Sequence, residues 1–392
     1  MKTVAHLLPD YNPFPPRYPA GTELRVAEVS RRQRRYRPVV ICGGFPGQPV
    51  SERDGAMEIQ RIHFGRVYRR VFQKLTRLDP WPYGKRMWRR IAACGAELIH
   101  IHNEPRLLAM LAGDLARDRR PVVVHIANDK PIRRELLPLV TRWVACSAYM
   151  AGWLEREVGV APGGIKVIHT GVDVGRRPPQ WQVAPQRRAE LRVRWGVAQD
   201  EFVFLFAGRL VKEKGVVGML DAFARLAAGR PVHLLVAGNV RESNDPKNEK
   251  AVYGRAVTAR MAGMERVHWV GSLHPDEMHD FLLAGDAFLL PSLWHDPFPT
   301  VMLEAACAGL PILAARRGGI TEFLEGCPGV PLLDEPGDPA ALAAAMQALV
   351  DRPDSGEAAG RWLHAKIAGH FDWSRVTADF EDLYDCLLGV SR

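Results

Sequence analysis

The sequence predicts an α/β protein made of two doubly wound parallel sheets. The chain has 392 residues, more than one hydrophobic core usually supports, so two domains are expected. Short apolar runs alternate with helical patterns in both halves, as they do in parallel sheets covered by helices on both faces. A segment rich in proline and arginine, residues 173–186, interrupts this alternation and is the expected interdomain linker.

The apolar runs have the length of strands and are bounded by turn residues. In the first half we expect strands at residues 3–8, 38–42, 98–102, 122–126, 143–145 and 166–168. In the second half we expect strands at 202–206, 232–237, 267–270 and 287–290, and helices at 215–228, 278–284 and 339–351. The less regular region 46–95 is expected to be an insertion or a helical edge. The loop at 9–21 follows the first strand, where an open α/β sheet places ligands.

The composition is that of an ordinary globular protein, with 47% hydrophobic and 25% charged residues. No run of about 18 apolar residues occurs, and the first residues are too polar for a signal peptide. We therefore expect a cytoplasmic protein. The six cysteines show no Cys-x-x-Cys or Cys/His spacing, so we expect reduced thiols and no zinc site.

The positive charge is concentrated in the first half of the chain. Residues 1–180 carry 31 Lys and Arg against 16 Asp and Glu, whereas the remainder carries 22 against 28. Basic clusters occur at 31–35, 66–70 and 85–90, the last two with aromatic residues interleaved. They are compatible with an anionic membrane surface, an anionic acceptor or a solvated surface. Nucleic acid is disfavoured because no recognised binding motif accompanies the charge.

The most informative segment runs from residue 295 to residue 322. It places two carboxylates, Asp296 and Glu304, eight positions apart around the start of a helix, and a glycine pair after the next strand. Because a carboxylate accepts hydrogen bonds from two neighbouring hydroxyls, Glu304 suits a ribose diol, and Asp296 is expected to face a sugar. The free N–H groups where the helix begins favour a diphosphate. The alternative is that Asp296 caps the helix and Glu304 is solvated.

A second segment, residues 204–215, is also expected to face phosphate. A strand ends at Gly208 and is followed by two cations, Arg209 and Lys214, before a helix begins. The guanidinium is a planar fork and the ammonium a point charge, so the pair can absorb the charge that builds on a diphosphate as a glycosidic bond breaks. The alternative is that both are ordinary exposed basic residues.

Both segments resemble the donor-site motifs of glycosyltransferase family 4. Residues 296–304 resemble its Glu-x7-Glu motif with Asp in the first place, and residues 208–215 resemble its Gly-Arg-Leu and Lys-Gly pattern. In the first half, residues 98–103, 124–125, 145–147 and 170–173 resemble its acceptor domain. Two positions depart from the family: Ala20-Gly21 replaces a Gly-Gly pair, and Thr170 replaces Asn. Within the family, the chain looks nearest to spore-coat-like and lipopolysaccharide-type transferases.

The resemblance implies a GT-B fold, in which two Rossmann-like domains face each other across a cleft. Residues 1–180 would bind the acceptor, residues 181–370 would bind the nucleotide sugar, and residues 371–392 would form a helix that crosses back to the first domain. The site residues carried over from the family fall into three groups. The expected catalytic residues are His125, Arg209, Lys214 and Asp296; the expected donor-binding residues are Glu304, Gly21, Gly208, Gly238, Asn239, Phe298, Pro299, Thr300, Gly318 and Gly319; the expected acceptor-binding residues are His102, Asn103 and Glu104.

The resemblance further implies retention of anomeric configuration without a metal or another cofactor, because Arg209, Lys214 and the amides near Gly318 would replace Mg²⁺. We expect a nucleotide-sugar donor, UDP-linked, and a lipid-linked saccharide or polysaccharide acceptor at the inner membrane face. The alternative from another class is a catalytically silent scaffold of the same fold that binds a nucleotide sugar or a partner protein. A phosphorylase or epimerase has less support, because no acid/base set is evident.

Overall fold

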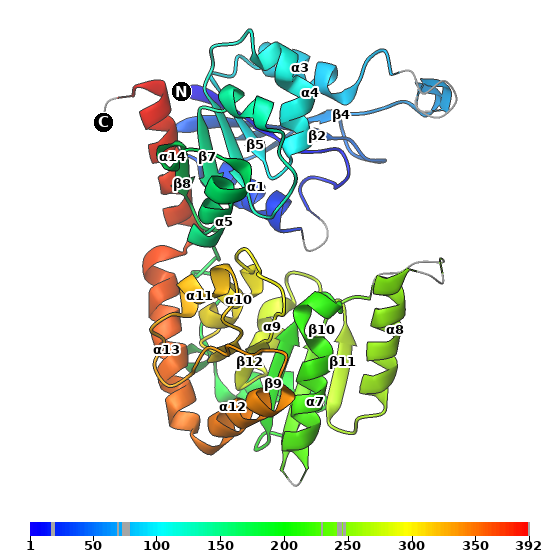
Figure 1. The fold of residues 1–392 in the computed structure, drawn as a ribbon, viewed down its shortest axis with the longest axis vertical. Helices are drawn as coiled ribbons and strands as arrows, with labels where there is room; N and C mark the ends of the chain where they lie inside the picture. The colour runs from blue at the N-terminus through cyan, green and yellow to red at the C-terminus, as the bar shows by residue number, and fades with distance from the viewer. Residues whose placement is uncertain are drawn as a thin grey trace. The chain divides into compact units, whose positions relative to one another are not determined.

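The structure is a computed structural model that describes residues 1–16, 20–68, 70–72, 79–228, 230–240, 245 and 248–390. Parts of the predicted loop 9–21 and of region 46–95 lie outside these residues. The chain divides into two compact units, which we call unit 1 (Met1–Thr170 with Trp373–Arg392) and unit 2 (Gly171–Asp372) (Figure 1). These boundaries lie at 170 and 372, where we expected 180 and 370.

Unit 1 contains an eight-stranded sheet in the order β3-β4-β2-β1-β5-β6-β7-β8. All pairs are parallel except β3 with β4. The strands are β1 Lys2–Leu7, β2 Tyr36–Gly43, β3 Ser51–Asp54, β4 Met57–Ile62, β5 Leu98–His102, β6 Val122–Ile126, β7 Arg142–Ala145 and β8 Ile165–Val167. The helices are α1 Gly21–Arg32, α2 Arg66–Tyr68, α3 Tyr83–Ala93, α4 Pro105–Leu115, α5 Ala148–Trp153 and α14 Trp373–Leu388, with short 3₁₀ or π turns at Arg134–Leu139, Leu154–Val158 and Pro162–Gly164.

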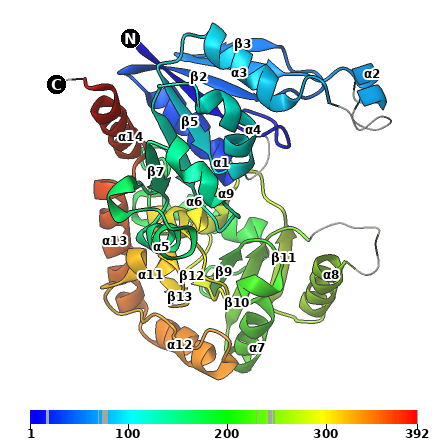
Figure 2. The same ribbon diagram turned by 45° about the horizontal axis from the view of Figure 1, so that its top comes forward.

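The last helix of the chain, α14, belongs to unit 1. Its apolar face, which includes Phe380 and Tyr384, packs against buried residues of β1, β5, β6 and β7. Figures 1 and 2 both show α14 running alongside the sheet at β7. Arg35 also holds α14 in place, because its backbone and side-chain N–H groups donate to Glu381 and its side chain forms an ion pair with Asp382. Residues from both ends of the sequence therefore form one core.

Unit 2 contains a five-stranded parallel sheet in the order β11-β10-β9-β12-β13. The strands are β9 Phe202–Ala207, β10 Val232–Ala237, β11 Val267–Gly271, β12 Ala287–Leu290 and β13 Ile312–Ala314. The helices are α6 Pro185–Arg194, α7 Val216–Ala227, α8 Glu249–Ala262, α9 Met278–Leu283, α10 Thr300–Cys307, α11 Gly319–Leu324, α12 Pro339–Asp351 and α13 Pro353–His370, with 3₁₀ turns at Gln180–Gln182 and Lys212–Lys214. Because β9, β10 and β12 are buried on both faces, they form continuous apolar runs in the sequence.

Region 46–95 differs from the expected insertion or helical edge, because it extends the sheet of unit 1. The hairpin of β3 and β4 pairs Ser51 with Gln60, and β4 lies parallel to β2. Residues 57–60 alternate between buried and partly exposed positions, as a strand requires. A charged residue at the next position obscured this pattern: Arg61 is only 1% exposed, donates to the carbonyl of Phe14 and pairs with Glu52.

The predicted linker also differs from expectation, because residues 173–186 are bound to unit 2 along much of their length. The amide of Gln180 donates to the carbonyl of Ala308 at 3.0 Å, and the thiol of Cys307 donates to the carbonyl of Arg177. Helix α6 begins at Pro185 with proline in its first turn, a position where the missing N–H has no helical partner to lose. The segment is therefore structural and not a free connection.

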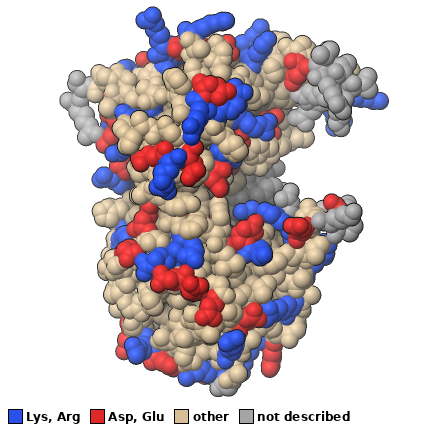
Figure 3. All heavy atoms as spheres, viewed as in Figure 1, with Lys and Arg blue, Asp and Glu red and all other residues tan. Residues whose placement is uncertain are grey.

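Each sheet reverses its strand order at one point, and this is where open α/β sheets bind ligands. In unit 1, β1 lies between β2 and β5; in unit 2, β9 lies between β10 and β12. The predicted site residues follow the carboxyl ends of these strands or their neighbours. Among the described residues, no helix combines the length and apolar character needed to cross a bilayer. On the face drawn in Figure 3, basic and acidic side chains are interspersed over both units.

Candidate functional site

In unit 2, the loops after β9 and β12 bring a lysine and a carboxylate together. Lys214 lies in the 3₁₀ turn after β9, Asp296 lies in the loop after β12, and their side chains form an ion pair. Both side chains are largely buried, 14% and 8% exposed. Asp296 is not a helix cap, since α10 begins at Thr300 with Pro299 at its N-cap. A carboxylate that is buried and paired is held in one orientation.

The glycine pair supports the carboxylate loop through close backbone contact. A Cβ at Gly318 would lie 2.3 Å from the carbonyl oxygen of Asp296, and one at Gly319 would lie 1.9 Å from that of Pro297. The amide of Gly319 donates to Asp296 O at 2.8 Å, and that of Gly318 to His295 Nδ1 at 3.2 Å. We expected these amides to face a diphosphate. In this structure they are bonded within unit 2, so they position Asp296.

Glu304 has a partner that the sequence did not indicate. It lies on α10 and accepts a hydrogen bond from Arg177 Nη1 at 2.6 Å. Burial would lower the pKa of Arg177, but attraction to Glu304 and the hydrogen bond outweigh it, and the pKa is raised. Glu304 is therefore not a solvated helix residue. Arg177 was assigned to the linker, and only the unusual run Arg176-Arg177-Pro178-Pro179 could have drawn attention to it.

The remaining donor-binding candidates of unit 2 divide into exposed and buried residues. Arg209 and Asn239, at the ends of β9 and β10, are exposed, and no ion pair of Arg209 occurs among the described residues. Gly208 and Gly238 are in close contact, since a Cβ at Gly238 would lie 1.9 Å from Gly208 O. Phe298, by contrast, is only 7% exposed.

The ring of Phe298 packs into the core of unit 2. Its ring stacks on Phe371 at 5.9 Å between centroids and meets the edge of Phe323 at 6.3 Å. Pro299 is also buried, whereas Thr300, the first residue of α10, is partly exposed. Phe298 therefore anchors the loop in the core and does not present its ring to a donor.

In unit 1, the acceptor-binding candidates after β5 are locked by hydrogen bonds. Asn103 has a φ of 50°, which is uncommon outside glycine, and its amide oxygen accepts from the amide of Ala127 at 2.9 Å. Glu104 caps α4 by accepting from the amide of Arg106 and pairs with Lys130 at 3.0 Å. Gly21 begins α1, and a Cβ built on it would meet no atom within 4 Å. Space is therefore open over Gly21.

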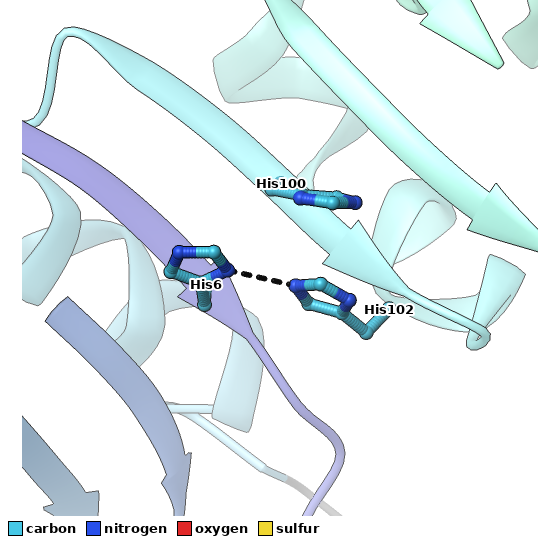
Figure 4. Close-up of side chains that lie close together, drawn as sticks. All are labelled: His6, His100 and His102. Carbon is cyan, nitrogen blue, oxygen red and sulfur yellow. Dashed lines mark hydrogen bonds between the residues drawn. The ribbon is translucent and has the colours of Figure 1, made fainter. Parts of the chain in front are cut away.

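Three buried histidines lie on two neighbouring strands of unit 1: His6 on β1, and His100 and His102 on β5 (Figure 4). His6 Nδ1 and His102 Nε2 are 2.9 Å apart, and His6 Nε2 lies 3.3 Å from the amide oxygen of Gln33. Because that oxygen only accepts, His6 carries its proton on Nε2, and His102 donates to its Nδ1. Burial lowers the pKa of His6 to about 4, so the ring is neutral near pH 7.

A fourth histidine, His125 on β6, contacts a buried arginine that the sequence did not single out. Arg25 Nη1 on α1 lies 2.8 Å from His125 Nε2, and both residues are at most 3% exposed. A guanidinium only donates, so Nε2 must accept and the proton of His125 must lie on Nδ1. Burial, and then the charge of Arg25, hold the pKa of His125 well below its usual value. His125 is thus fixed as a neutral ring with one defined tautomer.

The histidine cluster is the arrangement among the described residues whose spacing suits a metal, since ring nitrogens of His6, His100 and His102 lie within 4.8 Å of one another. Its surroundings oppose a cation. Arg25 is buried beside the rings, its charge lowers the pKa of His100 and His102 after burial does, and no ion pair neutralises it among the described residues. A divalent ion would add two charges to a buried positive region. The predicted absence of a metal stays a prediction.

Two parallel α/β units, each with polar residues at its topological switch point, define the class as GT-B. The chain has the fold of sucrose-phosphate synthase from Thermosynechococcus elongatus, with a TM-score of 0.80 and 18% identity over 100% of both chains. It has the same fold as Anabaena HepE, determined in complex with UDP-glucose, with a TM-score of 0.73 and 19% identity over 98% of this chain and 100% of the other.

Two family models match the sequence, one in each half of the chain. Residues 19–176 match the family described as Glycosyltransferase Family 4, and residues 187–362 match Glycosyl transferases group 1. Between them the two matches span most of the chain, and both describe glycosyltransferases. It is 29% identical to the lipopolysaccharide 1,2-N-acetylglucosaminetransferase of Salmonella typhimurium over 94% of each chain. It is 28% identical to the 2-deoxystreptamine glucosyltransferase of Streptomyces kanamyceticus over 91% of this chain and 95% of the other.

Proposed function

We propose that the protein transfers an N-acetylhexosamine or a hexose from a UDP-sugar to a lipid-linked saccharide or polysaccharide acceptor. The observation that carries the proposal is the buried ion pair of Lys214 and Asp296 at the switch point of unit 2. The relative from Salmonella is named for N-acetylglucosamine transfer to lipopolysaccharide, and HepE was determined with UDP-glucose. These names support the proposed donor and acceptor classes.

We infer that the cations of unit 2 stabilise the leaving group. As the sugar–phosphate bond breaks, negative charge builds on the diphosphate, and Lys214 and the exposed Arg209 would neutralise it in place of a metal. The ion pair with Lys214 fixes the orientation of Asp296, so its carboxylate can hold the sugar hydroxyls. In this proposal, side chains alone neutralise the charge on the leaving diphosphate.

Glu304 would hold the ribose of the nucleotide after an exchange of partners. Its carboxylate is bonded to Arg177, and a ribose diol offers two hydrogen bonds to the same oxygens. Binding of the donor would displace Arg177, which competes with the ribose for the same carboxylate oxygens. Donor affinity should accordingly depend on both residues.

We propose that the neutral His125 could donate from Nδ1 to the donor sugar only once this buried ring is uncovered, because it is 0% exposed here. We propose retention of configuration: the acceptor oxygen forms its bond to the anomeric carbon on the face from which the phosphate departs. The proton of the acceptor passes to the departing phosphate oxygen, so no pair of carboxylates at glycosidase spacing is needed. His125 takes no proton in this scheme, which agrees with its lowered pKa.

We further propose that the protein works in the cytoplasm at the inner membrane face, where a lipid-linked acceptor is presented. The excess of basic residues in 1–180 supports attraction to an anionic membrane. Sedimentation with vesicles of anionic and of zwitterionic phospholipid would test the attraction, and equal sedimentation with both would contradict it.

Nucleotide release from UDP-, GDP- and ADP-sugars, measured with EDTA present, tests the reaction directly. We expect release from a UDP-sugar that persists in EDTA and is lost in Lys214→Ala. Lys212→Ala is the matched control, since Lys212 is exposed in the same turn. Turnover that requires a divalent metal, or a control that fails like Lys214→Ala, would contradict the proposal.

A catalytically silent scaffold is the second candidate, and a specific observation favours it. Both acidic groups of the motif are already paired within the chain, Asp296 with Lys214 and Glu304 with Arg177. A scaffold predicts that Glu304→Ala, Arg209→Ala and Lys214→Ala leave cellular function unchanged. Loss of product in all three variants would exclude it.

A further inference from the structure

A basic pocket in unit 1 lies outside the residues discussed so far. It has a volume of about 280 Å³ and is lined by Ile62, His63, Trp81, Arg86, Arg89 and Arg90. Ile62 ends β4, and the three arginines occupy positions i, i+3 and i+4 of α3, which share one face of a helix. The opposite face of α3 is buried through Met87 and Ile91, so the arginines face away from the core.

The guanidinium groups are held in place by neutral partners. Arg86 Nε donates to the carbonyl of Trp81 at 2.8 Å, and Arg90 Nη2 donates to that of Arg61 at 3.0 Å. The guanidinium carbon of Arg89 lies 4.2 Å from the centre of the Trp81 ring. No carboxylate lines the pocket among the described residues. Three positive charges therefore share a small space, and none of them has an ion-pair partner among the described residues.

This arrangement favours an anion with several oxygens. Arginine forks bind phosphate with two parallel hydrogen bonds, and their planar geometry makes them more selective than lysine. The walls from Ile62 and Trp81 are apolar, and Trp81 is 41% exposed. An indole ring beside several guanidinium groups suits a sugar that carries a phosphate. The phosphate would bind the guanidinium groups, and the apolar face of the sugar would lie against the indole.

A membrane headgroup is the other source of phosphate. Of the aromatic residues interleaved with this basic cluster, Tyr83 is only 4% exposed and donates to the carbonyl of Leu8. Trp88 is partly buried and lies under Arg120. Within this cluster the large exposed ring is Trp81, and it forms a wall of the pocket. A hollow with one aromatic wall accommodates a single ring better than it accommodates a bilayer surface.

We propose that this pocket binds a phosphate-bearing sugar, either free or as part of a phosphorylated glycan acceptor. The assignment to an acceptor rests on the proposed transferase function, whereas binding itself does not require turnover. The acceptor class would then be an anionic saccharide, recognised at a position distinct from the residues expected to hold the reacting sugar.

Ligand-observed NMR with glucose 6-phosphate, glucose and inorganic phosphate tests the proposal on the intact protein without a donor. We expect glucose 6-phosphate to bind, with glucose and inorganic phosphate at least about tenfold weaker, because each supplies only half of the interactions. Arg89→Ala should weaken glucose 6-phosphate about tenfold, and Arg89→Lys should not restore it, since a point charge lacks the fork. Arg89 is exposed, so the change should not unfold the chain.

Lys85→Ala is the matched control, because Lys85 is exposed on the same helix but does not line the pocket. Equal losses in Lys85→Ala and Arg89→Ala would overturn the proposal, as would glucose 6-phosphate binding no tighter than inorganic phosphate. A separate experiment measures binding of the protein to vesicles of anionic phospholipid. If Arg89→Ala abolishes vesicle binding while glucose 6-phosphate does not bind the wild type, the pocket serves a membrane and the proposal fails. UDP-sugar hydrolysis, measured in parallel, reports on the proposed function independently.

Discussion

The switch points of the two units hold polar residues in opposite physical states. In unit 1, His6, His102 and His125 are buried and neutral, and each is hydrogen-bonded to another side chain. In unit 2, Asp296 forms an ion pair with Lys214, and Glu304 forms one with Arg177. A neutral network is set when the unit folds, whereas an ion pair can exchange one partner for a ligand. Under the proposed function, the difference predicts a preorganised unit 1 and a unit 2 whose contacts change on donor binding.

The largest expected effect follows from removing the cation of unit 2. Lys214→Ala deletes a charge that would stabilise the leaving diphosphate and leaves Asp296 buried and unpaired, so kcat/KM should fall about 10²–10³-fold. Steady-state kinetics with a UDP-sugar measure this, with Lys212→Ala as control. A double-mutant cycle with Asp296→Asn should show strong coupling; additive losses would mean that the two residues act separately.

Arg25→Met tests the neutral network of unit 1. Removing an unpaired buried charge should raise the melting temperature, while loss of the fixed tautomer of His125 should lower kcat/KM about tenfold. Because the charge of Arg25 acts with burial to depress the pKa of His125, that pKa should rise and the acid limb of the pH profile should move to higher pH. A variant that is less stable and fully active would show that Arg25 is structural only.

Glu304 and Arg177 form the exchangeable pair, and their variants should move donor affinity in opposite directions. Glu304→Gln should raise KM for the UDP-sugar about tenfold, because a ribose loses its charged acceptor. Arg177→Met should lower KM if Arg177 competes for the same oxygens, with kcat little changed. An increase in KM for both variants would mean that Arg177 binds the donor itself.

Acid should loosen unit 1 more than unit 2, because four buried histidines of unit 1 have lowered pKa values against His268 and His279 of unit 2. The folded pKa of His6 is about 4 against an unfolded value of 6.5, so the unfolded chain binds more protons between these values. The resulting stability is complete above about pH 6.5 and is lost as the pH falls towards 4. Hydrogen exchange of peptides from β1 and β5 should accelerate over this window relative to β12. Identical pH dependence of the three strands would contradict a histidine origin.

The smallest effect is expected from metal ions. Zn²⁺ or Co²⁺ added to the apo protein should leave its absorption and melting temperature unchanged, because Arg25 opposes a cation among the three histidines. Stoichiometric Co²⁺ binding that disappears in His102→Ala would overturn this expectation and would make the cluster a metal centre.

Much of the fold could be predicted from local patterns. The expected strands at 98–102, 122–126, 232–237 and 287–290 agree with β5, β6, β10 and β12, because buried parallel strands are continuous apolar runs. The hairpin of β3 and β4 was missed because Arg61 is buried through partners that lie up to 47 residues away. Phe298 was assigned to the donor because a motif gives the position of a residue but not the direction of its side chain.

The sequence by itself determined the two-domain α/β class, most of the central strands and the resemblance to glycosyltransferase motifs. These depend on periodicity, on residue size and on motifs within short segments. Only the tertiary structure decided which charges meet. Arg177 and Glu304 are 127 residues apart, and Arg25 and His125 are 100 apart. Such pairs leave no periodic signal, since their contact exists only after the strands and helices between them have packed.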